Sequence, residues 1–227
     1  DPAAYVEDWN RLIPKCLERR YLLADGSGRS MPVRFTVCDS GGEDGVTNRA
    51  YEFHRALVRK RLDHKFRLVK GGSNASAPRV EEKFPDTRNR TDRNAGSAGD
   101  VPVLMLNTDS LKDTVAADLG RATPGPGYYH FPDWLPTSAY EELTSEVRTG
   151  KRWVKTGRRN ESVDLCTYGE AAYIRLRGDA INWASPPSWA APWNSNPDVR
   201  RSEDPIPPPQ PRRPLRRTRS SYMDIYR

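Results

Sequence analysis

The segment VRFTVCDSGGEDGVTNRAYEFHRALVRKRLDHKFRLVKGG, residues 33–72, contains the pattern from which we predict the fold. Val33 to Cys38 is rich in β-branched and aromatic residues, as a short buried strand is, and the turn residues 39–42 end it. Four apolar residues at helical spacing predict a helix next: Val46, Ala50, Phe53 and Leu57. Phe66 to Val69 predicts a second strand, which ends at Lys70. We therefore expect a strand–helix–strand unit.

The same alternation of strands and helices continues to about residue 180. Short apolar and aromatic runs predict strands at 103–106, 128–131 and 152–155. Apolar residues three and four positions apart predict helices at 9–17, where Pro14 would kink the helix or end its first half, and at 111–119, 140–147 and 161–176. Asn107 to Ser110 and Asn160 are expected N-caps, and Ser138 with Glu141 has the spacing of a capping box. We predict an α/β domain over residues 1–180, with a central mixed sheet flanked by helices.

Two segments show no regular spacing of apolar residues. Residues 71–100 are dominated by Gly, Ser, Asn, Arg, Pro and Asp, which predicts a long surface loop. Residues 181–227 combine Trp and Pro with a cluster of arginines. Because such a composition cannot bury a core, we expect a disordered Trp/Pro/Arg-rich tail.

The charge balance favours a polyanionic partner. Lys and Arg outnumber Asp and Glu by 37 to 30, and part of the excess lies in the tail, at Arg212, Arg213, Arg216, Arg217 and Arg219. No apolar run is long enough to cross a bilayer, and residues 1–10 lack a signal-peptide pattern, so we expect a protein of the cytosol. The cysteines are far apart, which favours buried thiols over a disulfide or zinc site: Cys16, Cys38 and Cys166.

Carboxylates stand at two positions suited to ligand binding. Asp39 follows a buried strand, where ligands of α/β sheets bind, although it would serve equally to cap the turn. Glu161 and Asp164 lie three apart in the first turn of a predicted helix, on roughly one face, where the helix dipole keeps them ionised. That arrangement suits a metal ion, and it is also common for purely local reasons.

Basic residues adjoin the same predicted strand ends. Lys70 ends the second strand, and Asp109 and Lys112 follow the third, so these side chains are expected near one crevice. A lysine beside carboxylates can position a scissile phosphate, or it can be an ordinary surface residue. Three further basic residues lie before the last predicted helix, and they either contact phosphate or are simply solvated: Lys155, Arg158 and Arg159. Because no P-loop pattern follows Gly71, we expect no ATP hydrolysis.

Taken in order, five segments resemble the C-terminal nuclease part of the large subunits of lambda-type phage terminases. They are VCDSGG (37–42), FRLVKG (66–71), LNTDSLKD (106–113), PGPGYYHFP (124–132) with residues 140–146, and WVK (153–155) with RNESVD (159–164). The resemblance covers residues 1–178 and leaves the tail unmatched.

The resemblance implies a ribonuclease-H-like domain that cuts concatemeric phage DNA with two Mg²⁺ or Mn²⁺ ions. It makes Asp39, Asp164 and Asp109 the expected metal ligands, with Glu161 in a supporting role. It assigns Lys70 and Lys112 to phosphate positioning. It also implies double-stranded DNA, a terminase small subunit and, through the tail, the portal protein as partners, in the cytoplasm of an infected bacterium.

The resemblance has one departure that leaves a second hypothesis open. Members of that family carry another aspartate on a strand before the matched segments, and this chain starts without it. The alternative is therefore a catalytically silent module that clamps DNA or docks on the portal. A third hypothesis is a nuclease of the same fold that acts on branched DNA.

Overall fold

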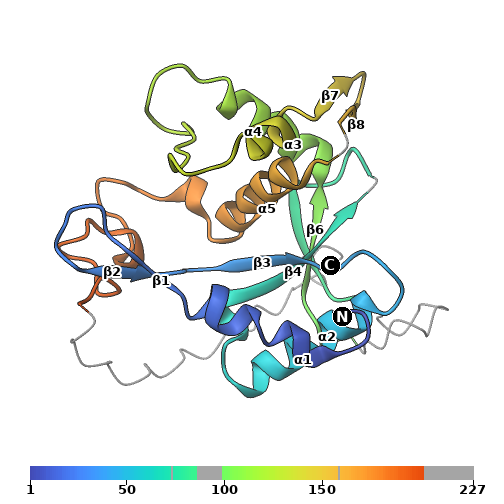
Figure 1. Cartoon of the computed structure of the whole chain (residues 1–227), viewed down its shortest axis with the longest axis horizontal. Helices are drawn as coiled ribbons and strands as arrows, with labels where there is room; N and C mark the ends of the chain where they lie inside the picture. The colour runs from blue at the N-terminus through green and yellow to red at the C-terminus, as the bar shows by residue number, and fades with distance from the viewer. Residues whose placement is uncertain (73, 86–98, 158, 202–227) are drawn as a thin grey trace, which may run out of the picture.

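A mixed four-stranded sheet lies at the centre of the computed structural model, which describes residues 1–72, 74–85, 99–157 and 159–201 (Figure 1). Strands β3 (Thr36–Asp39), β4 (Phe66–Gly72) and β6 (Val103–Asn107) are parallel neighbours in that order. Strand β5 (Val80–Lys83) pairs antiparallel with β6 at the far edge. The predicted α/β class with a mixed sheet is thus confirmed.

Residues 36–72 form the predicted strand–helix–strand unit. Helix α2 (Val46–Arg59) connects β3 to β4, as parallel strands require a crossover connection. Within the unit, Asp39 pairs with Val69, so both strands end at the same edge of the sheet.

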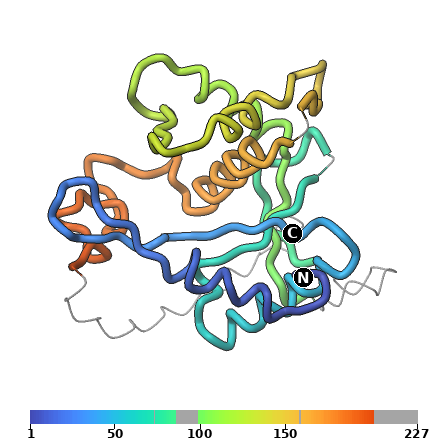
Figure 2. The backbone as a smooth tube through the Cα atoms, viewed as in Figure 1, coloured from blue at the N-terminus to red at the C-terminus, as the bar shows by residue number. Residues whose placement is uncertain are grey.

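Helices cover both faces of the sheet, as Figures 1 and 2 show, with α1 and α2 on one face and α3, α4 and α5 on the other. The first face carries α1 (Val6–Trp9), a π-helical turn at Ile13–Leu17 and α2, with a core that includes Trp9, Phe53, Leu57, Phe66 and Leu68. The second face carries α3 (Thr108–Leu119) and α5 (Glu161–Arg175), with a core that includes Val69, Leu104, Leu106, Leu111 and Ala171. Among the described residues, no helix combines the length and apolar character that crossing a membrane requires.

Strand β5 lies within the segment that was predicted to be a loop. Its side chains are mostly charged, and Glu82 accepts a hydrogen bond from Arg67 at 2.6 Å and lies 3.4 Å from Arg175 of α5. Its backbone pairs with β6 and Val80 packs against the core, but the other three residues are charged, so its sequence has no hydrophobic pattern. The hairpin of β1 (Arg20–Leu22) and β2 (Ser30–Pro32) was also not predicted.

Three predictions of secondary structure are wrong. The helix expected at 9–17 is interrupted after Trp9, in the region of Pro14, which lacks a backbone N–H. Residues 128–131 form no strand, and their rings instead contact one another and Tyr140, with one stacked pair and two edge-to-face pairs. The helix expected at 140–147 is α4 (Thr137–Leu143), and strand β7 (Glu146–Thr149) begins where that helix was expected to continue.

Strand β7 pairs with β8 (Arg152–Lys155) in a two-stranded hairpin that projects beside α3 and α4 (Figure 1). Val147 was assigned to a helix face, but it lies directly across from Val154 in the hairpin. Both valines are nearly half exposed, at 47% and 45%. Apolar burial therefore contributes little to holding this hairpin.

Residues 181–201 were assigned to the disordered tail, but they lie against the β1–β2 hairpin. Short 3-10 turns occur at Gly178–Ala180 and Ser188–Ala190, and Ser30 and Arg200 exchange backbone hydrogen bonds. Arg20 donates to the Asp198 carbonyl at 2.7 Å, and the Arg34 guanidinium stacks over the Trp189 ring. Residues 86–98 of the predicted loop and residues 202–227, with the arginine cluster, lie outside the described residues.

Helix α2 buries a histidine without a polar partner. His54 is 3% exposed, and neither ring nitrogen has a hydrogen-bond partner among the described residues. Burial lowers the pKa of His54, and the nearby Arg67 and Arg55 lower it further, whereas Asp63 and Asp100 oppose the shift. The folded protein therefore favours neutral imidazole more strongly than the unfolded chain does.

This difference predicts acid sensitivity. The contribution of His54 to stability should be complete above its ordinary pKa of 6.5 and should be lost as the pH falls below that value. Replacing His54 with Leu should reduce the fall in unfolding free energy between about pH 7.5 and pH 5.5, by at most about 1.4 kcal/mol, because only one pH unit of this window lies below 6.5. Urea unfolding at both pH values measures this. His130→Asn, at an exposed histidine, is the control, and equal acid sensitivity of wild type and His54→Leu would contradict the prediction.

Candidate functional site

Asp39 connects the end of β3 to helix α5. Its Oδ1 accepts the Gly41 N–H at 2.8 Å, and its Oδ2 accepts the Tyr168 hydroxyl at 3.2 Å. Side chains alternate along a strand, so Asp39 is on the same sheet face as Val37, which packs in the core beneath α5. A side chain at Gly41 would place its Cβ 3.3 Å from the Asp39 carboxylate, so glycine leaves room for this conformation. Asp39 thus both caps the turn and faces α5.

Tyr168 connects α5 to the sequence-predicted carboxylate Asp39. It follows Asp164 by one helical turn on α5 and donates its hydroxyl proton to Asp39. Burial raises the pKa of Tyr168, and the negative charges of Asp39, Asp164 and Glu161 raise it further. The hydroxyl is therefore a protonated donor at neutral pH.

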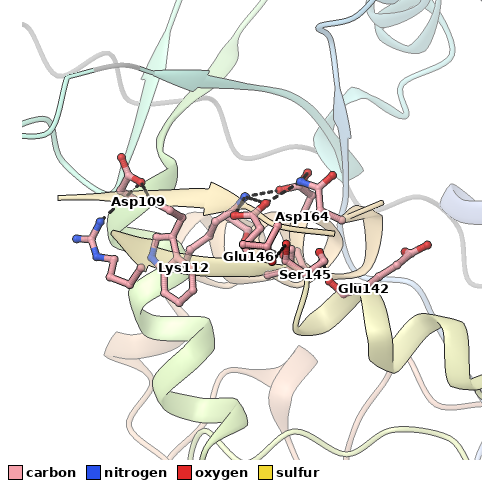
Figure 3. A network of polar contacts seen from close by, with 12 residues as sticks. Asp109, Lys112, Glu142, Ser145, Glu146 and Asp164 are labelled. Atoms are coloured by element: carbon pink, nitrogen blue, oxygen red, sulfur yellow. Dashed lines mark hydrogen bonds and ion pairs between the residues drawn. The ribbon is translucent and has the colours of Figure 1, made fainter. Parts of the chain in front are cut away.

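The buried Lys112 ammonium joins three elements on the α5 face of the sheet, as Figure 3 shows. Lys112 Nζ of α3 lies 2.7 and 2.9 Å from the two carboxylate oxygens of Glu146 in β7, and 2.8 Å from Asp164 Oδ1 in α5. The Asn160 amide donates to Glu146 Oε1 at 2.7 Å and to Asp164 Oδ2 at 2.9 Å. The side chain of Glu146 is 5% exposed and that of Lys112 is 11% exposed, whereas that of Asp164 is 29% exposed.

The electrostatics of this network keep Lys112 charged. Burial disfavours its ammonium, but the hydrogen bonds to Asp164 and Glu146 outweigh burial and raise the pKa of Lys112. Two carboxylates and one ammonium leave a net negative charge at the site. A charge buried without a partner is costly, so removing either Glu146 or Lys112 would destabilise the packing of α3, β7 and α5.

The first turn of α5 is fixed by α4 rather than by the predicted N-cap. Asn160 occupies the N-cap position but makes no capping hydrogen bond, since its amide is engaged by Glu146 and Asp164. The carboxylate of Glu142 instead accepts the Ser162 N–H at 3.1 Å and its hydroxyl at 3.0 Å. This contact sets where α5 begins and hence where Asp164 lies. At α3, by contrast, the predicted cap is confirmed, because Asn107 accepts the Ser110 N–H.

Asp109 lies apart from the other predicted metal ligands. Its carboxylate accepts the backbone N–H of Trp153 at 2.7 Å, and Arg148 lies 3.8 Å away. Asp113, one turn later, accepts the indole N–H of Trp153 and pairs with Arg148 at 3.0 Å. In Figure 3, Asp109 is on the opposite side of Lys112 from Asp164. Its contacts hold the β7–β8 hairpin against α3.

The remaining predicted site residues lie at the edge of the site or on the other face of the sheet. Lys70 is exposed and lies two residues after Leu68, so strand alternation places it on the sheet face of α2, opposite Asp39. Glu161 is exposed at the start of α5, and Lys155 lies across the hairpin from Glu146. Arg159 is 70% exposed and pairs with Glu142 at 3.3 Å, while Arg158 lies outside the described residues.

Sequence reasoning did not identify Glu146, Tyr168 or the bridging role of Asn160 as part of the site. Tyr168 had a usable signal, because a residue four positions after Asp164 shares its helix face. Glu146 had none, since it was assigned to a helix that the structure does not contain.

The donor atoms of the site suit a hard divalent cation. Within the described ranges, no three His, Cys, Asp or Glu side chains converge closely enough to hold a metal ion. Glu146 and Asp164 nevertheless direct carboxylate oxygens at one ammonium, and oxygen ligands are those that Mg²⁺ and Mn²⁺ prefer.

Comparison with known proteins identifies the family. Residues 1–183 match the family described as terminase large subunit gpA, endonuclease domain. No curated protein and no solved structure matches the chain. The family match confirms the resemblance found in the sequence, and it implies DNA cleavage in phage DNA packaging. The chain therefore belongs to the endonuclease domains of the terminase large subunit gpA family.

Proposed function

We propose that this domain cuts concatemeric phage DNA by metal-dependent phosphodiester hydrolysis with two metal ions. The observation that carries the proposal is the hydrogen bond between Asp39, at the carboxyl end of β3, and Tyr168, one helical turn after Asp164 on α5. Ligands of α/β sheets bind at this edge. The family match supplies DNA as the substrate.

Asp39 and Asp164 are the residues that would hold the metal ions. When bound, Mg²⁺ or Mn²⁺ would supply an activated water and stabilise the leaving oxygen. Tyr168 orients the Asp39 carboxylate through its hydrogen bond, and Asn160 orients that of Asp164. Glu161 has a supporting electrostatic role. Asp109 would act indirectly, through the hairpin that it holds, and a phosphate contact by Lys70 stays a prediction.

Basic residues beside the site would hold the DNA backbone. Lys155 ends β8, and Arg159 follows it before α5, so both lie at the approach to Asp164. Arg158 belongs to the same turn in the sequence. Such residues contact phosphate without reading the base sequence.

The finer architecture and the partners are also proposals. A mixed sheet with helices on both faces supports a ribonuclease-H-like fold for residues 1–180. By family resemblance, a terminase small subunit would direct the domain to its cutting site, and the basic tail would dock on the portal protein in the infected cell.

One observation favours a second candidate function, a catalytically silent module that clamps DNA or docks on the portal. Lys112 already pairs with Asp164, and no group of three possible metal ligands occurs among the described residues. In that case the basic residues beside the site would bind DNA, and the carboxylates would serve only to anchor α3 and the hairpin.

Cleavage of supercoiled plasmid at low salt, with Mn²⁺, Mg²⁺ or EDTA, separates the two functions. We expect metal-dependent cutting that Asp39→Asn and Asp164→Asn each reduce by about a hundredfold or more, because each removes a charged ligand. Asp133→Asn, at an exposed aspartate, is the matched control and should cut like wild type. Absence of cutting by folded protein that still binds DNA would favour the silent module.

DNA binding by the basic residues beside the site should depend on salt concentration in a specific way. Lys155→Ala and Arg159→Ala should each weaken binding to a short duplex and lower the slope of log affinity against log salt by about one. Fluorescence anisotropy at several salt concentrations measures both quantities. Lys60→Ala removes the same charge from the end of α2, on the other face of the sheet, and should leave both unchanged. An unaltered slope in the Lys155 and Arg159 variants would show that the DNA lies elsewhere.

A further inference from the structure

An arginine–aromatic surface, formed by residues 18–34 and 177–201, lies at the end of the sheet where β3 begins. Figure 1 shows the β1–β2 hairpin and the segment after α5 side by side, at the left of the view. Besides the backbone bridge between Ser30 and Arg200, the Arg29 guanidinium donates to the Asn194 side chain at 3.0 Å. Residues 184–201 lie outside the part of the chain that matches the family, so the family match assigns them no role.

A buried amide fixes the shape of the segment after α5. The Asn196 side chain donates to the carbonyls of Trp189 and Ala191 at 2.9 and 3.3 Å, and it accepts the Asp198 N–H at 2.9 Å. Asn196 is buried, and a buried polar group whose hydrogen bonds are made holds the backbone around it rigidly. Since Trp193 lies between these bonded residues in the sequence, it is held in a built loop.

This surface exposes aromatic rings that the loop and the β1–β2 hairpin hold in place. Trp183 is 65% exposed, Trp193 is 44% exposed and Tyr21 is 57% exposed. Leu22, beside Tyr21, is exposed as well. Large apolar groups that gather on a folded surface mark a place where a partner binds.

The charge of the surface indicates the kind of partner. Residues 18–34 and 177–201 contain seven arginines, no lysine and four carboxylates, which is an excess of three positive charges. Two of the arginines also lie over aromatic rings, Arg19 over Tyr21 and Arg34 over Trp189, each at 5.1 Å from the ring centroid. Because a guanidinium both pairs with phosphate and stacks on flat rings, this combination suits a nucleic acid better than an uncharged protein surface.

We propose that the arginine–aromatic surface binds single-stranded DNA, with its exposed rings stacked on unpaired bases and its arginines on the phosphates. Aromatic side chains stack on any base, and basic residues follow the backbone without reading the sequence. An intact duplex keeps its bases stacked on one another, so it would contact the arginines but not the rings.

The surface is separate from the proposed cutting site. Asp39 ends β3, whereas the β1–β2 hairpin precedes the start of that strand, and Asp164 lies in the first turn of α5, whereas residues 177–201 follow its last turn. The helix rises about 16 Å between Asp164 and Arg175. A DNA strand that runs from the site to the surface therefore spans at least about five nucleotides, at roughly 3.4 Å each.

Fluorescence anisotropy of a short labelled oligo(dT) and of a short duplex, with the whole chain in EDTA, tests the proposal. Trp193→Ala and Tyr21→Ala should each weaken oligo(dT) binding about fivefold or more, the effect of losing one stacked base. Duplex binding should change by less than about twofold, since it does not use the rings. Both changes keep every charge of the chain, including the arginines after residue 201, so they isolate stacking.

Two further variants separate stacking from an effect on the fold. Trp193→Phe keeps an aromatic ring and should retain most of the oligo(dT) affinity. Trp134→Ala removes a ring that is 77% exposed in the loop before α4, and it should leave both affinities unchanged. An equal loss of duplex and oligo(dT) binding in Trp193→Ala would overturn the proposal. So would unchanged oligo(dT) binding in both ring variants, and a protein would then be the better partner for the rings.

Plasmid cutting in Mn²⁺ is read separately, so this proposal and the proposed function can fail independently. Cutting by a chain whose oligo(dT) binding does not depend on the rings keeps the nuclease and rejects this surface. Ring-dependent oligo(dT) binding without cutting keeps the surface and rejects the nuclease.

Discussion

The packing of α3, α5 and the β7–β8 hairpin depends on one constraint, the nearly complete burial of the Glu146 carboxylate. A carboxylate that is 5% exposed is stable only with a cation and hydrogen-bond donors beside it. Lys112 and Asn160 provide them, and their contacts require α3, the β7–β8 hairpin and α5 to meet at one point. The hairpin has little apolar burial of its own, so Asp109 and Asp113 complete its attachment to α3.

The sheet provides the other half of the site through a different kind of interaction. Parallel pairing brings the ends of β3 and β4 to one edge, and side-chain alternation turns Asp39 toward α5. Helix α5 links the halves, since Asp164 faces the buried ammonium and Tyr168, one turn later, reaches Asp39. The Glu142 cap fixes the start of α5 and so sets both contacts.

Sequence reasoning succeeded where the pattern is periodic and local. Alternating apolar runs predicted β3, α2, β4 and β6, and they placed Asp39 correctly at the end of β3. The charged strand β5 had no such pattern, because its Glu82 is stabilised by Arg67 and Arg175, which are distant in sequence. Asp109 shows the limit most clearly. Its spacing placed it near the other carboxylates, but its actual partner, the backbone of Trp153, lies 44 residues away.

The two faces of the sheet therefore have different physical characters. The α1–α2 face is closed by aromatic and aliphatic packing, in which Phe53 contacts the rings of Trp9 and Phe66. The α3–α5 face has its own apolar core, but toward the strand ends ion pairs and hydrogen bonds replace it. A close-packed core cannot change without loss of stability. Concentrating the carboxylates near the strand ends therefore keeps their charges and hydrogen bonds apart from the apolar packing that holds the sheet.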